Sequence, residues 1–178
     1  MVVLGAIIEK VSGLNYFDYI RQHIYKPAAM NQTDRFDLND HPANVAEGYI
    51  PQEDGTYQNN NNTKGILPSP AGGGYSNVRD LHKFALALSS GKLVSSSSKN
   101  KLFTDHMGMD YGYGFQVQSF EGGKIVGHSG KAPGVNAVLY ILQEKEYIVA
   151  VMSNYHSSVE WLSEYILHLM RNEDGLKE

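Results

Sequence analysis

The sequence contains no cysteine, which excludes disulfide bonds, thiolate chemistry and cysteine-based metal sites. It also lacks any hydrophobic run as long as a transmembrane helix, so we predict no membrane span. No basic residues precede Val2, Val3 and Leu4, so no signal peptide is visible. The compartment stays open: the protein is exported if a segment ahead of residue 1 carries a signal, and cytoplasmic otherwise.

Basic clusters and metal-ligand spacings are absent as well. The formal net charge is −4 and Lys and Arg are scattered, so we predict no nucleic-acid partner. The histidines show no His-Glu-x-x-His or similar spacing, so we predict no metal and no cofactor. With 178 residues, 42% of them hydrophobic, the chain is typical of one globular domain, residues 1–178.

The N-terminal quarter of the chain is predicted to be helical. Leu4, Ile7, Ile8 and Val11 recur at helical spacing, and Gly13 ends this helix. No capping residue precedes it, which gives it the look of a helix cut at its start. Asn15 is expected to cap a second helix that Pro27 ends.

The middle of the chain alternates irregular and helical character. Residues 31–70 are polar and rich in turn formers, which predicts a long irregular segment. After Gly72-Gly73-Gly74, we expect Ser76 to cap a helix over residues 77–88, with Gly91 as its stop. The serine run 95–98 is expected to open a further helix that reaches Met107.

The last third is predicted to be an antiparallel meander followed by a helix. Short runs rich in β-branched and aromatic residues alternate with turns, and they cover residues 113–118, 124–128, 136–142 and 147–152. A final amphipathic helix is expected from Ser157 or Ser158 onward. The predicted fold class is therefore α+β, of the α/β sandwich type, with an antiparallel sheet packed by helices.

The sharpest chemical signal is Gly127-His128-Ser129-Gly130 at the end of a predicted strand. The imidazole can polarise or protonate a substrate, the hydroxyl of Ser129 can donate a hydrogen bond, and Gly130 lets a substrate backbone approach closely. A histidine without a role, beside a glycine-rich turn, explains the pattern by itself equally well.

Longer stretches favour the chemical interpretation. The helix Leu4–Gly13, the segment Ile24–Pro27, and the runs Pro70–Ser76, Tyr111–Phe115 and Gly127–Gly130 follow one another in a distinctive order, completed by Pro133-Gly134 and Met152-Ser153-Asn154. In this order they resemble the penicillin-recognising serine hydrolases: class C β-lactamases, DD-peptidases and related esterases. The resemblance covers nearly the whole chain, and it implies the C-terminal part of a β-lactamase/transpeptidase-like fold without its N-terminal strands and nucleophile helix.

In that family, Ser-x-x-Lys supplies the nucleophile and base, Tyr-x-Asn a second proton-transfer group, and a Lys/His-Thr/Ser-Gly strand holds the substrate. By resemblance, His128 is the catalytic candidate, Ser129 and Gly130 bind substrate, and the backbone N–H of Lys131 forms half of an oxyanion hole. The resemblance places both missing motifs ahead of Met1.

Two departures from the family pattern stand out. Histidine in place of the β-lactamase lysine is more similar to the esterase, aminopeptidase and peptidase branches, and Lys131 stands where a small residue is common.

Literal copies of the missing motifs also occur, at Ser96-x-x-Lys99, Ser98-x-x-Lys101, Tyr75-Ser76-Asn77 and Tyr57-Gln58-Asn59. Their polar or turn-rich surroundings differ from the buried apolar helix that the family's nucleophile opens, so we expect them to be coincidental.

The leading hypothesis is a hydrolase fragment, inactive alone, whose parent cleaves a small peptide, ester or β-lactam-like substrate through an acyl-enzyme. One rival is a stand-alone module that keeps the groove for binding. Another is a half that a separate N-terminal chain completes. The resemblance implies that N-terminal strands normally cover one edge of the sheet, so their loss would leave Tyr147–Met152 or a neighbour open to a second copy, as a homo-oligomer.

Overall fold

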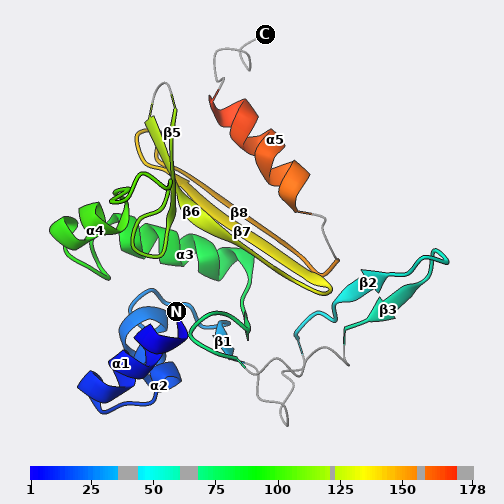
Figure 1. Ribbon diagram of the computed structural model, residues 1–178, viewed down its shortest axis with the longest axis horizontal. Helices are drawn as coiled ribbons and strands as arrows, with labels where there is room; N and C mark the ends of the chain where they lie inside the picture. Colours follow the sequence, from blue (N-terminus) through cyan, green and yellow to red (C-terminus); the bar gives the residue numbers. More distant parts are fainter. Residues whose placement is uncertain (36–43, 61–67, 121–122, 156–158, 172–178) are drawn as a thin grey trace. The chain divides into compact units, whose positions relative to one another are not determined.

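The computed structural model describes residues 1–35, 44–60, 68–120, 123–155 and 159–171 (Figure 1). The chain divides into two compact units. The first contains Met1–Ala46 and Asn61–Ser95, and the second contains Glu47–Asn60 and Ser96–Glu178.

The first unit begins with the two predicted helices. Helix α1 (Val2–Ser12) has no side-chain cap at its start and ends at Gly13, whose φ of 72° closes it in the left-handed conformation. Helix α2 (Tyr16–Ile20) is capped by Asn15, whose side chain accepts a hydrogen bond from the N–H of Phe17. The π-helical turn η1 (Arg21–Tyr25) follows directly, so both predicted helices and the Asn15 cap are confirmed.

Helix α1 does not pack against the first unit through the apolar residues that recur at helical spacing. Leu4, Ile7 and Val11 have 55%, 50% and 78% of their surface exposed, whereas Gly5 is buried. A Cβ atom added at Gly5 would lie 2.1 Å from Cγ of Pro70, so only glycine allows α1 to pack this closely against the proline ring. Within the described residues, the periodic positions therefore form an uncovered face.

The rest of the first unit is built around a helix and a very short sheet. Strand β1 (Asp34–Arg35) pairs antiparallel with β4 (Gly74–Tyr75), and helix α3 (Val78–Ser89) comes next. The predicted cap, Ser76, is wrong: the side chain of Asn77 accepts the N–H of Asp80. The hydroxyl of Ser76 contacts that of Thr33 at 2.8 Å, which uses it in a tertiary contact rather than in a cap.

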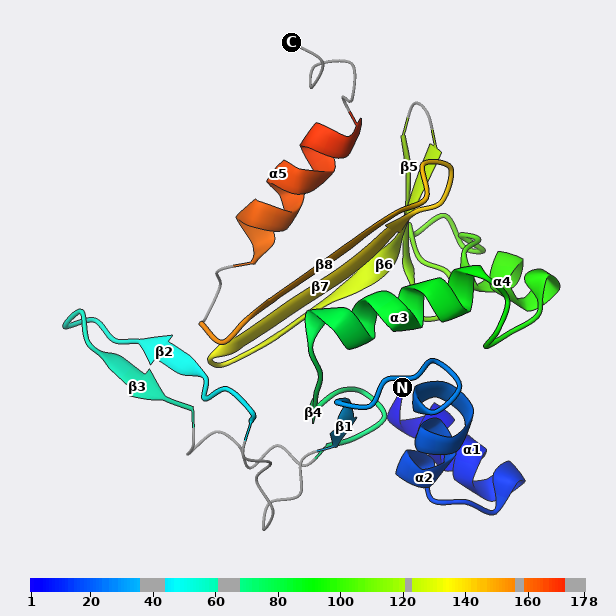
Figure 2. The ribbon, with the colours of Figure 1, turned by 180° about the vertical axis from the view of Figure 1, so that it is seen from behind.

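The second unit contains the predicted meander. Its four-stranded antiparallel sheet has the order β5-β6-β7-β8 (Figure 2). The strands are β5 (Gln116–Phe120), β6 (Gly123–Ala132), β7 (Val135–Leu142) and β8 (Tyr147–Ser153). The short helix α4 (Ser96–Leu102) precedes them. This mixed helix and antiparallel-sheet architecture confirms the predicted α+β class.

Helix α5 (Glu160–Arg171) packs on one face of that sheet (Figure 1). Leu167 joins Ile125, Leu142 and Val149 in a buried cluster, with each of the four at most 5% exposed. Because side chains alternate between the two faces of a strand, these residues share one face of the sheet, and α5 covers that face. The predicted start of the last helix, at Ser157 or Ser158, lies outside the described residues.

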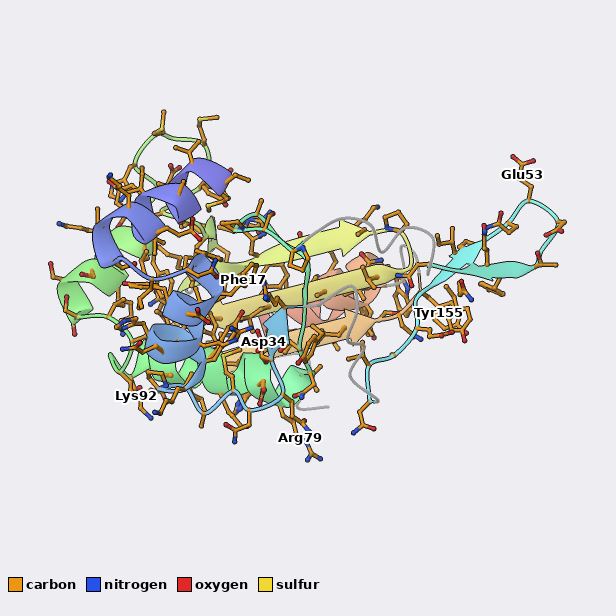
Figure 3. The ribbon with its side chains drawn as sticks, turned by 90° about the horizontal axis from the view of Figure 1, so that it is seen from below. Phe17, Asp34, Glu53, Arg79, Lys92 and Tyr155 are labelled. Atoms are coloured by element: carbon orange, nitrogen blue, oxygen red, sulfur yellow. The ribbon has the colours of Figure 1, made fainter. Side chains whose placement is uncertain are left out.

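A hairpin interrupts the segment that was predicted to be irregular. Strands β2 (Tyr49–Pro51) and β3 (Tyr57–Asn59) pair antiparallel within residues 44–60. The ring of Tyr155 (Figure 3), just beyond β8, lies 5.6 Å from the ring of Tyr49 and 5.4 Å from that of Tyr57. The sequence of this hairpin is only a weak predictor of strands. Aromatic contacts with Tyr155, which follows the last strand of the sheet, add to its stability.

No helix in the part of the chain that the structure describes is both long and apolar enough to cross a bilayer.

Candidate functional site

Strand β6 carries all four predicted site residues. His128, Ser129, Gly130 and Lys131 are exposed and pair, in register, with Leu139, Val138, Ala137 and Asn136 of β7. Because side chains alternate along a strand, His128 and Gly130 share one face and Ser129 and Lys131 the other. The strand was expected to end at this motif, but it runs on to Ala132, where Pro133 and Gly134 make a two-residue turn into β7.

The two edges of β6 are covered to different extents. On one side β7 pairs with it as far as Ala132, opposite Val135. On the other side, β5 pairs with it only from Gly123 to Gly127. Among the described residues no strand covers the outer edge beyond that point, where His128 to Gly130 lie. An extended chain can add to such an edge through backbone hydrogen bonds.

Gly127 and Gly130 of β6 differ in how closely other atoms pack around them. A Cβ atom added at Gly127 would lie 2.0 Å from the carbonyl oxygen of Leu139, so the fold requires glycine there. A Cβ added at Gly130 would meet nothing within 4 Å. Packing among the described residues therefore does not require glycine at position 130.

Tyr111 contacts the catalytic candidate directly. Its hydroxyl oxygen lies 2.9 Å from Nε2 of His128, and the two rings meet edge to face with centroids 5.8 Å apart. The other ring nitrogen of His128, Nδ1, lies 2.6 Å from the carbonyl oxygen of Ser129. Sequence reasoning quoted Tyr111 only as part of a motif and assigned it no role, because the two residues are 17 positions apart.

The loop that presents Tyr111 is organised by Asp105. Its carboxylate accepts backbone N–H groups from Met107, Met109 and Asp110. These hydrogen bonds, that from Met107 first, lower the pKa of Asp105 below its ordinary value. The side chains of Met107 and Met109 are 79% and 71% exposed, so an apolar surface lies in the same loop as Tyr111.

Asn60 holds the turn at the far end of the site strand. Its Nδ2 donates to the carbonyl oxygen of Pro133 at 3.2 Å, and its Oδ1 accepts the N–H of Gly48 at 3.2 Å. A Cβ atom at Gly48 would lie 2.4 Å from the carbonyl oxygen of Gly134, so the two segments touch backbone to backbone. In the sequence, Asn60 is one asparagine in a run of four and carries no distinguishing signal.

The literal copies of the missing motifs have structural surroundings of another kind. Ser96 and Ser98 are exposed and lie in α4, a helix of seven residues without a buried side chain. Ser76 and Asn77 make the tertiary contact and the helix cap described above. Tyr57, Gln58 and Asn59 form an exposed strand.

A separate pocket of about 280 Å³ lies in the first unit. Aromatic side chains from α2 and η1 line one part of it, Asp34 and Arg35 another, and the Ser69–Gly74 loop the rest. Figure 3 labels two of the lining residues, Phe17 and Asp34. Arg21 pairs with Asp34 at 2.8 Å, and burial raises the pKa of Tyr25 to about 12. The pocket contains none of the predicted site residues.

Over the described residues, no group of three His, Asp or Glu side chains is arranged to hold a metal ion.

Comparison with known proteins identifies relatives of this chain. It is 31% identical to penicillin-binding protein 4* of Bacillus subtilis (strain 168) over 177 residues, and 31% identical to the putative penicillin-binding protein PbpX of the same organism over 163. The matches cover 90% and 89% of this chain but 39% of each relative, so the chain spans about two fifths of their length.

Solved structures show the same relation. The penicillin-binding protein of Bacillus halodurans superposes with a TM-score of 0.87 at 29% identity, over 93% of this chain and 53% of that one. The D-amino acid amidase of Ochrobactrum anthropi SV3 has a TM-score of 0.77 at 20% identity, over 96% of this chain and 56% of that one, and shows a shared fold. The sequence pattern of the family described as Beta-lactamase matches residues 1–167. The chain therefore belongs to the β-lactamase family.

Proposed function

We propose that this chain supplies the substrate-binding strand of a β-lactamase-related serine hydrolase that cleaves an amide or ester through an acyl-enzyme. The observation that carries the proposal is the outer edge of β6, where His128 and Gly130 are exposed beyond the last residue that β5 covers. A substrate backbone can lie along this edge as an added strand, and such pairing orients its carbonyl group for attack.

The roles along the strand follow from chemistry and position. His128 stabilises or protonates groups that gain negative charge as the carbonyl is attacked. Ser129 donates a hydrogen bond to the substrate, Gly130 leaves room for its backbone, and the N–H of Lys131 serves as one oxyanion donor. The nucleophile's hydroxyl forms the new acyl bond, the leaving amine or alcohol takes its proton, and water later breaks the acyl bond.

We further propose that these 178 residues do not hydrolyse such a substrate alone. Neither Ser-x-x-Lys copy resembles a nucleophile site, because Ser96 and Ser98 are exposed on a short polar helix. Removal of the serine nucleophile lowers kcat by about 10⁶ in a well-characterised serine protease. The names of the two Bacillus subtilis relatives favour a penicillin-like ligand for a longer protein that carries the missing motifs.

Covalent labelling tests the proposal. The chain is incubated with a penicillin and its intact mass is measured, and no adduct is expected. An adduct that maps to Ser96 or Ser98 would overturn the proposal.

A reading frame ahead of the Met1 codon that encodes Ser-x-x-Lys and Tyr-x-Asn would supply the longer chain. That chain should be labelled, and substitution of His128 by Ala should slow its acylation.

A second candidate function is a non-catalytic module that binds another copy through its sheet. Strand β8 lies at the edge of the sheet, and Ile148–Met152 contains neither a charge nor a proline to discourage edge pairing. Light scattering at high concentration should then show a dimer, and Ala150→Lys should return it to a monomer. A monomer at every concentration would contradict this candidate.

A further inference from the structure

The two nitrogens of the His128 ring have partners of different kinds. Nδ1 lies 2.6 Å from the carbonyl oxygen of Ser129, and a carbonyl oxygen can only accept a hydrogen bond. Nδ1 must therefore carry a proton. In the neutral imidazole the other nitrogen, Nε2, then has a lone pair and accepts.

The partner of Nε2 is the hydroxyl of Tyr111, at 2.9 Å. A phenol donates to a lone pair at this distance, and it can turn its own lone pair toward the ring when His128 is protonated. We infer that Tyr111 is a positioning residue for His128: the Ser129 carbonyl keeps the proton of the neutral imidazole on Nδ1, and the Tyr111 hydroxyl donates to Nε2 and holds the ring in one orientation. The significance of this role for catalysis rests on the proposed function.

The backbone around Tyr111 is well placed to hold that hydroxyl still. Tyr111 forms an isolated bridge with Gln116, and the N–H of Gly112 donates to the carbonyl oxygen of Phe115. A Cβ atom at Gly112 would lie 2.0 Å from the carbonyl oxygen of Leu102, so the loop is pressed against the end of α4. On the other side, Asp105 ties Asp110 by its backbone N–H.

A fixed tautomer has a consequence for the site. The Nε2 lone pair is directed at Tyr111 and is not available to a ligand while this hydrogen bond lasts, so neutral His128 does not act as a free base at Nε2. Its ring keeps one orientation beside the open edge of β6. Both ring nitrogens then have partners within the chain, so the protonating role proposed for His128 requires that one of these two hydrogen bonds is released.

Nitrogen NMR tests the assignment on the chain as it is. With ¹⁵N-labelled histidine, the neutral form of His128 should show the chemical shift of a protonated nitrogen at Nδ1 and that of an unprotonated, hydrogen-bonded nitrogen at Nε2. The substitution Tyr111→Phe keeps the ring and removes the hydroxyl, so the Nε2 shift should move toward that of an unprotonated nitrogen without a hydrogen bond, while Nδ1 stays protonated.

The matched control is Tyr113→Phe in the same loop, because the Tyr113 ring stacks on His106, with centroids 4.5 Å apart. This control should leave the His128 signals unchanged. A proton on Nε2 in the unsubstituted chain would overturn the inference without any variant, and so would an unchanged Nε2 shift in a folded Tyr111→Phe chain.

The NMR result does not depend on any hydrolysis, so the two proposals fail separately. If the longer chain lacks activity but His128 has the expected tautomer, the proposed function is wrong and the positioning role stands. If the longer chain is active, Tyr111→Phe should lower kcat about tenfold with little change in KM. An unchanged kcat would remove the catalytic significance of Tyr111.

Discussion

The Oδ2 atom of Asp80 accepts a hydrogen bond of 2.7 Å from the backbone N–H of Gln32, 48 residues earlier in the chain. The same oxygen accepts the hydroxyl of Thr33, and Oδ1 pairs with Lys83 at 2.8 Å. Burial by itself would raise the pKa of Asp80, but the hydrogen bonds from Lys83, Gln32 and Thr33 outweigh it and lower the pKa. The first turn of α3 thus anchors the segment that follows η1.

The substitution Asp80→Asn should lower the free energy of unfolding by about 2 to 3 kcal/mol, because a buried, hydrogen-bonded charge is replaced by an amide that donates where acceptors are needed. Urea unfolding followed by circular dichroism measures the change. Glu53→Gln, at the exposed turn between β2 and β3 (Figure 3), is the control and should leave the stability unchanged. Equal stability in the two variants would contradict the role of Asp80.

Acid should remove the contribution of Asp80. Its pKa is lower in the folded state than the ordinary value of 3.8, so the folded state binds this proton more weakly than the unfolded state does. The stabilisation is fully present above that value and is lost as the pH falls through the lowered pKa. The stability difference between the original chain and Asp80→Asn should therefore shrink below about pH 4. A constant difference down to the acid transition would count against this linkage.

Two glycine substitutions in β6 should differ in their effect on the stability of the fold. Gly127→Ala should destabilise the chain by about 1 to 3 kcal/mol, because its methyl group overlaps the backbone at Leu139. Gly130→Ala has open space and should change stability by less than about 0.5 kcal/mol. Thermal unfolding of both chains gives the comparison, and a larger loss for Gly130→Ala would refute it.

The Asp105 loop should loosen in acid. The pKa of Asp105 is lowered, chiefly by the N–H of Met107, so its contacts persist above the ordinary value of 3.8 and are lost as the pH falls through the lowered pKa. Asp105→Asn weakens the same hydrogen bonds at neutral pH. Hydrogen exchange should then accelerate at Met107, Met109 and Asp110 while the sheet amides stay protected. Unchanged exchange at these three amides would show that the loop is held by other contacts.

Removal of the Asn60 side chain should loosen the turn between β6 and β7. Asn60→Ala loses the bond to Pro133 and leaves the N–H of Gly48 without its acceptor, which should cost about 1 to 2 kcal/mol. The exposed neighbour Gln58→Ala is the matched control. Chemical denaturation measures both, and the prediction fails if the two substitutions have the same small effect.

Local sequence features were enough to predict the elements whose stability is local. Asn15 and Gly13 have side chains or backbone freedom suited to a helix start and a helix end, and both serve as predicted. The runs that became β5 to β8 alternate and are separated by turn residues, so the order of the meander was readable as well. The family also followed from the sequence, since the order of its motifs is specific even where each motif is short.

Other features required contacts that no local pattern encodes. Ser76 and Asn77 are both good helix caps, and the structure uses Asn77 as the cap while the hydroxyl of Ser76 contacts Thr33. The hairpin of β2 and β3 is polar, and Asn60 owes its role to Pro133, 73 residues away. Without the partner, nothing in the residue itself distinguishes it from its neighbours.

The sequence alone therefore determined the family, the α+β class and the strand that carries His128, Ser129, Gly130 and Lys131, because periodicity, caps and motif order are properties of neighbouring residues. Only the tertiary structure decided that β5 stops short of His128, and that the Tyr111 hydroxyl lies within hydrogen-bond distance of its ring. Strand pairing and hydrogen bonds across 17 positions depend on the path of the backbone, which is set by the packing of the whole unit.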